Sequence, residues 1–286
     1  MSFAETVILG GLAGLTIYLG LPFGRLQIIG DRARVALAMF AVGVLAFLFA
    51  DIFEHALGIV EEPVEAFKDG EQGIGEAVGL VALLAAGFAA GTAGLATLER
   101  WMGPTGLARP PVAGGSVDVL TVEDAERLKA ETESARRRAL RVGMTIAAAI
   151  GLHNFAEGLA IGVSASTGEI ALATVLIVGF ALHNATEGFG IIGPLGETRP
   201  TWGWLALAGL VAGGPVFLGS IVGYNVTSEP LELAFYGLAG GAILYVIGEI
   251  WNGMRRYGHR ELGLWLLSAG FLVGIATDLV VVYGGG

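Results

Sequence analysis

Eight long apolar runs constrain the fold of this 286-residue chain more than any other feature. A helix needs about 20 apolar residues to cross a hydrocarbon core about 30 Å thick. In lipid, only helices and closed barrels satisfy all of their backbone hydrogen bonds, and runs of this length lack the alternation of barrel strands. We place the predicted spans at residues 5–23, 35–59, 74–97, 141–164, 170–192, 203–225, 231–253 and 261–283. The sequence therefore predicts an all-α polytopic membrane protein, a single-domain bundle of eight transmembrane helices over residues 1–286.

The distribution of basic residues predicts how this bundle is oriented. All but one of the 16 lysines and arginines fall in the first, third, fifth and seventh connections, and Lys68 alone lies in the second. Because cytoplasmic loops carry the excess of Lys and Arg, we expect the odd-numbered connections to be cytoplasmic and both termini to lie outside. We expect a multi-pass protein of the cell (inner) membrane.

Composition excludes several classes of function. With 16 basic and 26 acidic residues the net charge is −10, so the chain has no basic surface suited to nucleic acid. The absence of cysteine excludes disulfides and thiolate metal sites. The 47 glycines, about twice the usual share, suggest close helix packing. Glycine pairs four residues apart, which permit such crossings, occur at Gly10 and Gly14, Gly87 and Gly91, and Gly237 and Gly241.

One connection, residues 99–140, is long. It begins with a stretch rich in Pro and Gly and continues from Thr121 as a charged run with a plausible helix start. We expect a linker followed by a solvated cytoplasmic helix that runs into the fourth span.

Ionisable side chains inside the spans are the most informative residues. Each costs about 2.5 to 3.5 kcal/mol near the middle of a membrane helix, so such residues usually mark a site. Three of the four histidines lie in predicted spans, each with an acidic residue one helical turn away. These pairs are Asp51 with His55, His153 with Glu157, and His183 with Glu187.

Two of these pairs belong to a near-repeat, Leu152-His-Asn-Phe-Ala-Glu-Gly158 and Leu182-His-Asn-Ala-Thr-Glu-Gly188. The i, i+4 spacing places imidazole and carboxylate on one helix face, and a short turn near Thr167 makes the two helices antiparallel neighbours. Two His and two Glu can then converge, with Asn154 and Asn184 one residue further round. Nitrogen and oxygen ligands of this kind suit a borderline divalent ion such as Zn²⁺, as one ion or as two bridged by the carboxylates.

The remaining intramembrane charges have weaker interpretations. A single buried His–Glu pair can simply fix helix register, although two matched pairs argue against this. Asp51 and His55 lie in the outer half of their span, where a role in an outer vestibule competes with metal ligation. Glu249 lies near the cytoplasmic end of the seventh span, and Asp278 in the last span has no evident partner. An acidic second connection is expected to face outward; its acidic residues are Glu61, Glu62, Glu65, Asp69 and Glu71.

At these residues the chain resembles the ZIP family of divalent-metal transporters, of bacterial or archaeal type. The resemblance rests on eight spans, the long third connection and the paired HNxxEG segments. It implies that the core of the transport site is formed by His153, Glu157, His183 and Glu187. It further implies a second, adjacent metal position served by Asn154, Asn184 and Glu249, a role for His55 in the first position, a place for Asp51 towards the entrance, and a homodimer.

The chain departs from the family pattern in three respects. Many members have proline between the Asn and the Glu of each motif, whereas Phe155-Ala156 and Ala185-Thr186 stand here. Bacterial relatives often have Gln where this chain has His183. The long third connection, His-rich in many relatives, contains no histidine.

The resulting hypothesis is a carrier that brings Zn²⁺ or a related ion (Cd²⁺, Fe²⁺, Mn²⁺ or Co²⁺) into the cytoplasm, with the metal as substrate and no cofactor. One alternative is a metal-gated channel, whose flux would not saturate with ion concentration. Another is an intramembrane metalloenzyme, which is disfavoured because the hydrolytic HExxH pattern is absent.

Overall fold

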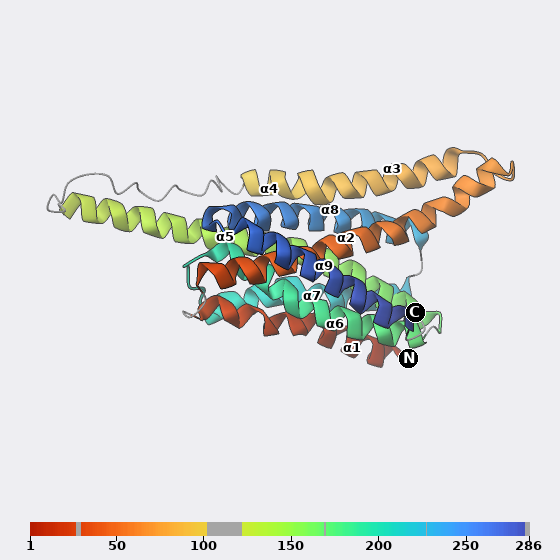
Figure 1. Cartoon of the computed structure of the whole chain (residues 1–286). Coiled ribbons are helices and arrows are strands. Elements are labelled where there is room, and N and C mark those ends of the chain that lie inside the picture. The colour runs from red at the N-terminus through yellow and green to blue at the C-terminus, as the bar shows by residue number, and fades with distance from the viewer. Residues whose placement is uncertain (27–29, 102–121, 169, 227, 284–286) are drawn as a thin grey trace.

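The computed structural model describes residues 1–26, 30–101, 122–168, 170–226 and 228–283. Within these ranges the chain is entirely helical, without a strand (Figure 1). The helices are α1 (Phe3–Leu15), α2 (Asp31–Lys68), α3 (Gly75–Ala89), α4 (Leu95–Trp101), α5 (Val122–Ser166), α6 (Ile170–Ile192), α7 (Trp202–Asn225), α8 (Glu229–Met254) and α9 (Arg260–Tyr283). Short 3-10 segments are η1 (Thr16–Leu19), η2 (Leu21–Arg25), η4 (Gly193–Leu195) and η5 (Arg255–Tyr257), and a π-helical turn, η3 (Ala90–Gly94), joins α3 to α4.

The eight predicted spans are confirmed in the described part of the chain. Eight helical segments are long and apolar enough to cross a membrane. The first combines α1 with η1 and η2, and the third combines α3, η3 and α4. Both termini lie at the same end of the bundle, as an even number of crossings requires (Figure 1).

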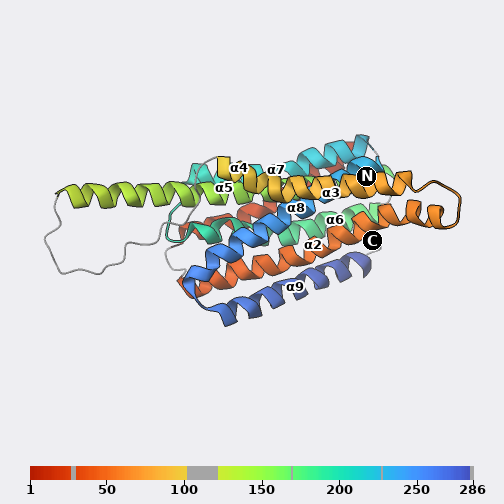
Figure 2. The same cartoon turned by 90° about the horizontal axis from the view of Figure 1, so that it is seen from above.

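Two helices are much longer than a membrane span and project from opposite ends of the bundle (Figures 1 and 2). At 1.5 Å per residue, α2 with 38 residues is about 57 Å long and α5 with 45 residues about 68 Å. The helix that runs into the fourth span is thus confirmed from Val122 onward, whereas the predicted linker before it falls mostly outside the described residues. The second span does not end as helix at residue 59: α2 continues to Lys68, so the acidic second connection begins as helix.

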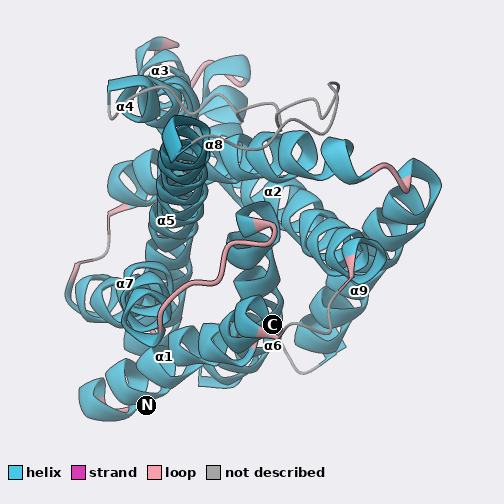
Figure 3. Ribbon diagram, turned by 90° about the vertical axis from the view of Figure 1, so that its left-hand side faces the viewer, coloured by secondary structure: helices cyan, strands magenta, loops and turns pink. Residues whose placement is uncertain are grey.

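Burial separates central from peripheral helices. In α5, 72% of the most apolar window is buried, against 11% in the α3–α4 segment and 17% in α9. Figure 3, seen along the bundle, shows α5 beside α7 and α8, with α3 and α9 towards the outside. Helices with so little buried surface fit a lipid-facing position, because lipid solvates apolar side chains as well as a protein core does.

Glycines allow close contact at the expected crossings. Gly87 and Gly91 pack against the backbone of α8 at Gly237 and Gly241, and Gly14 packs against Gly213 of α7. At each of these positions an added Cβ would meet backbone atoms of the neighbouring helix. The small-residue pattern seen in the sequence is therefore confirmed as a packing feature.

Candidate metal-binding site

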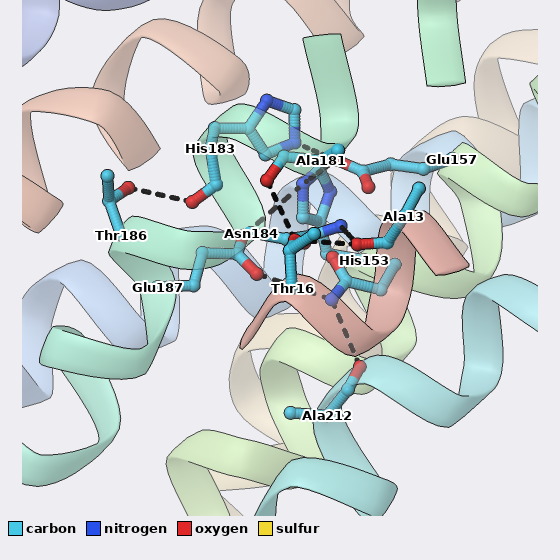
Figure 4. A network of polar contacts seen from close by, with 11 residues as sticks. Ala13, Thr16, His153, Glu157, Ala181, His183, Asn184, Thr186, Glu187 and Ala212 are labelled. Carbon is cyan, nitrogen blue, oxygen red and sulfur yellow. Dashed lines mark hydrogen bonds and ion pairs between the residues drawn. The ribbon is translucent and has the colours of Figure 1, made fainter. Parts of the chain in front are cut away.

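The two HNxxEG motifs face each other across α5 and α6. These helices are joined by a tight turn in which Gly168 has a positive φ of 89°, a conformation that glycine adopts without strain. Nε2 of His153 lies 2.9 Å from Oε1 of Glu157 on its own helix, and Nε2 of His183 on α6 lies 2.5 Å from the same oxygen (Figure 4). Glu187 Oε1 is 3.9 Å from Nε2 of His153. The predicted convergence of two imidazoles and two carboxylates is therefore present in the structure.

Buried atoms without hydrogen-bond partners concentrate in this cluster. Among the described residues, seven buried side-chain oxygens and nitrogens form no hydrogen bond, and six belong to the two motifs. These six are both ring nitrogens of His153, Oδ1 of Asn154, Oε2 of Glu157, Oδ1 of Asn184 and Oε1 of Glu187. One of the six, Nε2 of His153, lies at ion-pair distance from Oε1 of Glu157. Buried polar groups are normally paired, and leaving one unpaired costs about 1–3 kcal/mol. A bound cation would provide these unpaired oxygen and nitrogen atoms with a partner.

The donor set fits a divalent metal chemically as well. Ligand atoms of His153, Glu157 and His183 all lie within 4.8 Å of one another, and all three residues are buried. Imidazole nitrogen and carboxylate oxygen are common ligands of Zn²⁺ and of neighbouring divalent ions.

Each motif asparagine is held by the backbone of a further helix. Nδ2 of Asn154 donates to the carbonyl of Ala212 in α7 (3.0 Å) and to Oε2 of Glu187 (3.2 Å). Nδ2 of Asn184 donates to the carbonyl of Ala13 in α1 (3.4 Å). Since a carbonyl can only accept, these contacts assign the amide nitrogens, and both Oδ1 atoms are left as free acceptors.

The glycine that ends each motif has a packing role. A Cβ added to Gly158 would lie 2.9 Å from the Cα of Gly219 in α7, and one added to Gly188 would lie 2.8 Å from the Cα of Gly20, which follows η1. The two motifs are thus built alike: α5 is joined to α7, and α6 to the first span, by one asparagine and one glycine each. No local pattern indicates these partners, because both contacts join distant parts of the chain.

Comparison with known proteins supports the same assignment. Residues 116–247 match the family described as "ZIP Zinc transporter". The chain is 28% identical to the zinc transporter ZupT of Corynebacterium glutamicum over 272 residues, 91% of this chain and 95% of that protein. These matches support a protein of the ZIP type. The chain is 26% identical to ZupT of Clostridium perfringens over 80% of this chain and 83% of that protein, and 30% identical to ZIPB of Bordetella bronchiseptica over 44% and 42%.

Together with the eight apolar helices, these matches support a multi-pass membrane protein that transports divalent metal. ZIP proteins are transporters and not enzymes. The metalloenzyme alternative is therefore wrong.

A cavity of about 440 Å³ adjoins this site. His153, Glu157 and His183 line one part of it, and the other part is lined by residues from the terminus-side halves of α2, α8 and α9. The structure places Asp51 and His55 in this wall rather than in the ligand cluster. Nδ1 of His55 is bonded to the carbonyl of Asp51 (2.9 Å), and 62% of the His55 side chain is exposed. Asp278, which had no evident partner in the sequence, lines the same cavity.

Glu249 is not one of the residues whose ligand atoms converge in this cluster, which are His153, Glu157 and His183. Its neighbour Ile250 packs against Gly190, about one helical turn beyond Glu187. Glu249 interacts electrostatically with Glu99 in the last turns of α4. Glu99 is only 6% exposed and accepts a hydrogen bond of 2.5 Å from the hydroxyl of Tyr245. The seventh unpartnered atom is Oε1 of Glu99. Sequence reasoning missed this residue because it was placed at the start of a solvated connection.

Proposed function

We propose that this ZIP protein imports Zn²⁺ or a related divalent ion through a site formed by His153, Glu157, His183 and Glu187. The observation that carries the proposal is the set of unpartnered buried acceptor atoms in the two motifs. Asn154 and Asn184 contribute Oδ1 atoms to the same site or to a second position beside it. Two ions sharing the Glu157 and Glu187 carboxylates are compatible with this ligand set.

Entry from the side of the termini is supported by the cavity, which connects the buried cluster with exposed residues such as Glu54 and His55. On the positive-inside rule this side is the outside of the cell. Carboxylates and imidazoles would replace the hydration shell of the ion, and rearrangement of the helices around the site would open it to the other side, as in carriers with midplane sites. Release is assisted by protonation, since His and carboxylate must lose a proton to bind metal.

The decisive experiment is Zn²⁺ uptake into vesicles that contain the purified protein. We expect saturable uptake in the wild type and its loss in the double variant His153→Ala, Glu157→Ala. A matched control is His259→Asn, Glu261→Gln, a His and acid pair at the start of α9 that lies outside the cavity. Asn tolerates the positive φ of 51° at residue 259. Unchanged uptake in the first variant would overturn the site assignment.

The same assay separates the remaining alternatives. A carrier saturates with ion concentration, whereas a metal-gated channel would show flux that keeps rising. Competition by Cd²⁺, Fe²⁺, Mn²⁺ and Co²⁺ would rank the ions that the site accepts. The homodimer implied by the family resemblance stays a prediction, to be tested by the mass of the detergent-solubilised protein.

A further inference from the structure

Thr16 lies where the first transmembrane segment changes its geometry. α1 ends at Leu15, and the chain continues from Thr16 in 3-10 segments to Arg25. Interrupted helices expose backbone groups and lie beside substrate sites in many transporters. Here the interruption faces the second motif, because Gly20 packs directly on Gly188.

The Thr16 hydroxyl joins this interruption to α6. Its Oγ1 atom lies 2.7 Å from the carbonyl oxygen of Ala13 in its own helix and 2.7 Å from that of Ala181 in α6. The single hydroxyl hydrogen is shared between these two acceptors. Ala181 comes two residues before His183, so the contact is made directly before the second motif (Figure 4).

The Ala13 carbonyl is also the partner of a motif residue. It accepts the amide of Asn184, and Oδ1 of Asn184 stays buried without a partner. The first motif has an equivalent arrangement, in which Asn154 is held by the carbonyl of Ala212 in α7. Pro215 lies in the same turn and leaves the adjacent Val211 carbonyl without its helical N–H donor. In the first span no proline lies within the corresponding turn, and the side chain at the interruption is Thr16.

We propose that Thr16 is a positioning residue for metal transport. By fixing the Ala13 carbonyl against α6, it holds the amide nitrogen of Asn184 away from the metal and leaves Oδ1 to face it. This rests on the proposed function above, in which Asn184 belongs to the metal site.

The test compares Thr16→Val, which keeps the side-chain shape but removes the hydroxyl, with Thr16→Ser, which keeps the hydroxyl. For Zn²⁺ uptake into vesicles we expect Thr16→Val to raise KM about 3- to 10-fold with little change in maximal rate, the effect of losing roughly one hydrogen bond. Thr16→Ser should restore the wild-type KM. The matched control is Thr6→Val: Thr6 is buried in the same helix, but its hydroxyl bonds only the carbonyl of Ser2, one turn earlier.

A double-mutant cycle with Asn184→Ala separates positioning from general stability. If Thr16 acts through Asn184, the two changes in KM will be non-additive. Additive effects, an unchanged KM in Thr16→Val, or equal losses in Thr16→Val and Thr6→Val would each overturn the proposal. If Asn184→Ala raises KM but Thr16→Val does not, the positioning role of Thr16 is overturned while Asn184 stays in the proposed metal site. If Asn184→Ala has no effect, Asn184 leaves the proposed site and the positioning proposal falls with it.

Discussion

Oε1 of Glu157 on α5 lies 2.5 Å from Nε2 of His183 on α6. The same oxygen also lies 2.9 Å from Nε2 of His153. A single carboxylate oxygen therefore joins the two motif helices, and an ion held by both imidazoles would lie beside Glu157. This makes Glu157 the most sensitive position of the site.

Replacing Glu157 by Gln removes this anionic ligand while keeping the side-chain volume. We expect the KM for Zn²⁺ uptake to rise at least about tenfold, equivalent to about 1.4 kcal/mol of binding free energy. Glu232→Gln, in the cavity wall, is the matched control and should change KM much less. Equal effects of the two substitutions would mean that Glu157 contributes only its negative charge to the electrostatic potential of the cavity and is not a metal ligand.

Zn²⁺ binding should weaken as the pH is lowered. His and Glu bind metal only after losing their protons, so protons compete with the ion and binding releases protons. Calorimetry in buffers of different ionisation enthalpy would measure the number of protons released. A proton release of zero, together with pH-independent affinity, would contradict ligation by these side chains.

Asn154→Ala should destabilise the protein by about 1–3 kcal/mol, because Glu187 loses a hydrogen-bond donor inside a buried cluster. Thermal unfolding in detergent would measure the loss. Asn225→Ala offers a comparison, since the Asn225 amide is exposed and bonds only the carbonyl of Ile221 in its own helix; there we expect a change within about 0.5 kcal/mol.

Alanine at either motif glycine should prevent close helix contact. At Gly158 and Gly188 the new methyl group would overlap backbone of α7 or of the first span, and overpacking of this kind costs about 1–3 kcal/mol. Gly79→Ala in α3, where the methyl would meet nothing within 4 Å, should leave the melting temperature unchanged or slightly raised. A stable, fully active Gly188→Ala variant would argue against the α6 contact with Gly20.

Tyr245→Phe tests the buried carboxylate of Glu99. Hydrogen bonds to charged groups contribute about 1.5–3 kcal/mol, against about 0.5–1.5 kcal/mol for neutral pairs. Tyr245→Phe should therefore lower the free energy of unfolding more than Tyr18→Phe, whose hydroxyl bonds the neutral carbonyl of Ala206. The opposite order would indicate that Glu99 is protonated or solvated.

Much of this architecture could be predicted from local patterns. The eight apolar runs predict the spans, and the i, i+4 spacing places His153 beside Glu157 and His183 beside Glu187. Both signals depend only on neighbours within one helix. The short connection near Thr167 also predicts that α5 and α6 lie side by side, because a turn of a few residues can join two helices only as antiparallel neighbours.

What could not be predicted depends on distant contacts. The partners of Asn154 and Asn184 are backbone carbonyls of other helices, which no side-chain pattern specifies. The helical start of the second connection was not predicted, because the residues after 59 are polar. Glu, Ala and Lys favour helix even when solvated, so the helix continues past the apolar run. Glu99 was also missed because it follows the end of an apolar run. Such a run shows where contact with lipid ends, but Glu99 is buried by its contact with α8, which the run does not reveal.

On each face of the membrane, one long helix extends beyond the bundle and can carry a label. The end of α2 projects on the side of the termini, and the start of α5 projects on the opposite side (Figure 1). An epitope at residues 61–68 and a protease site at residues 126–135 would therefore be accessible from different compartments. A single intact-cell labelling experiment with both would report the absolute orientation of the transporter, and in vesicles the same pair would count the fraction of molecules facing each way.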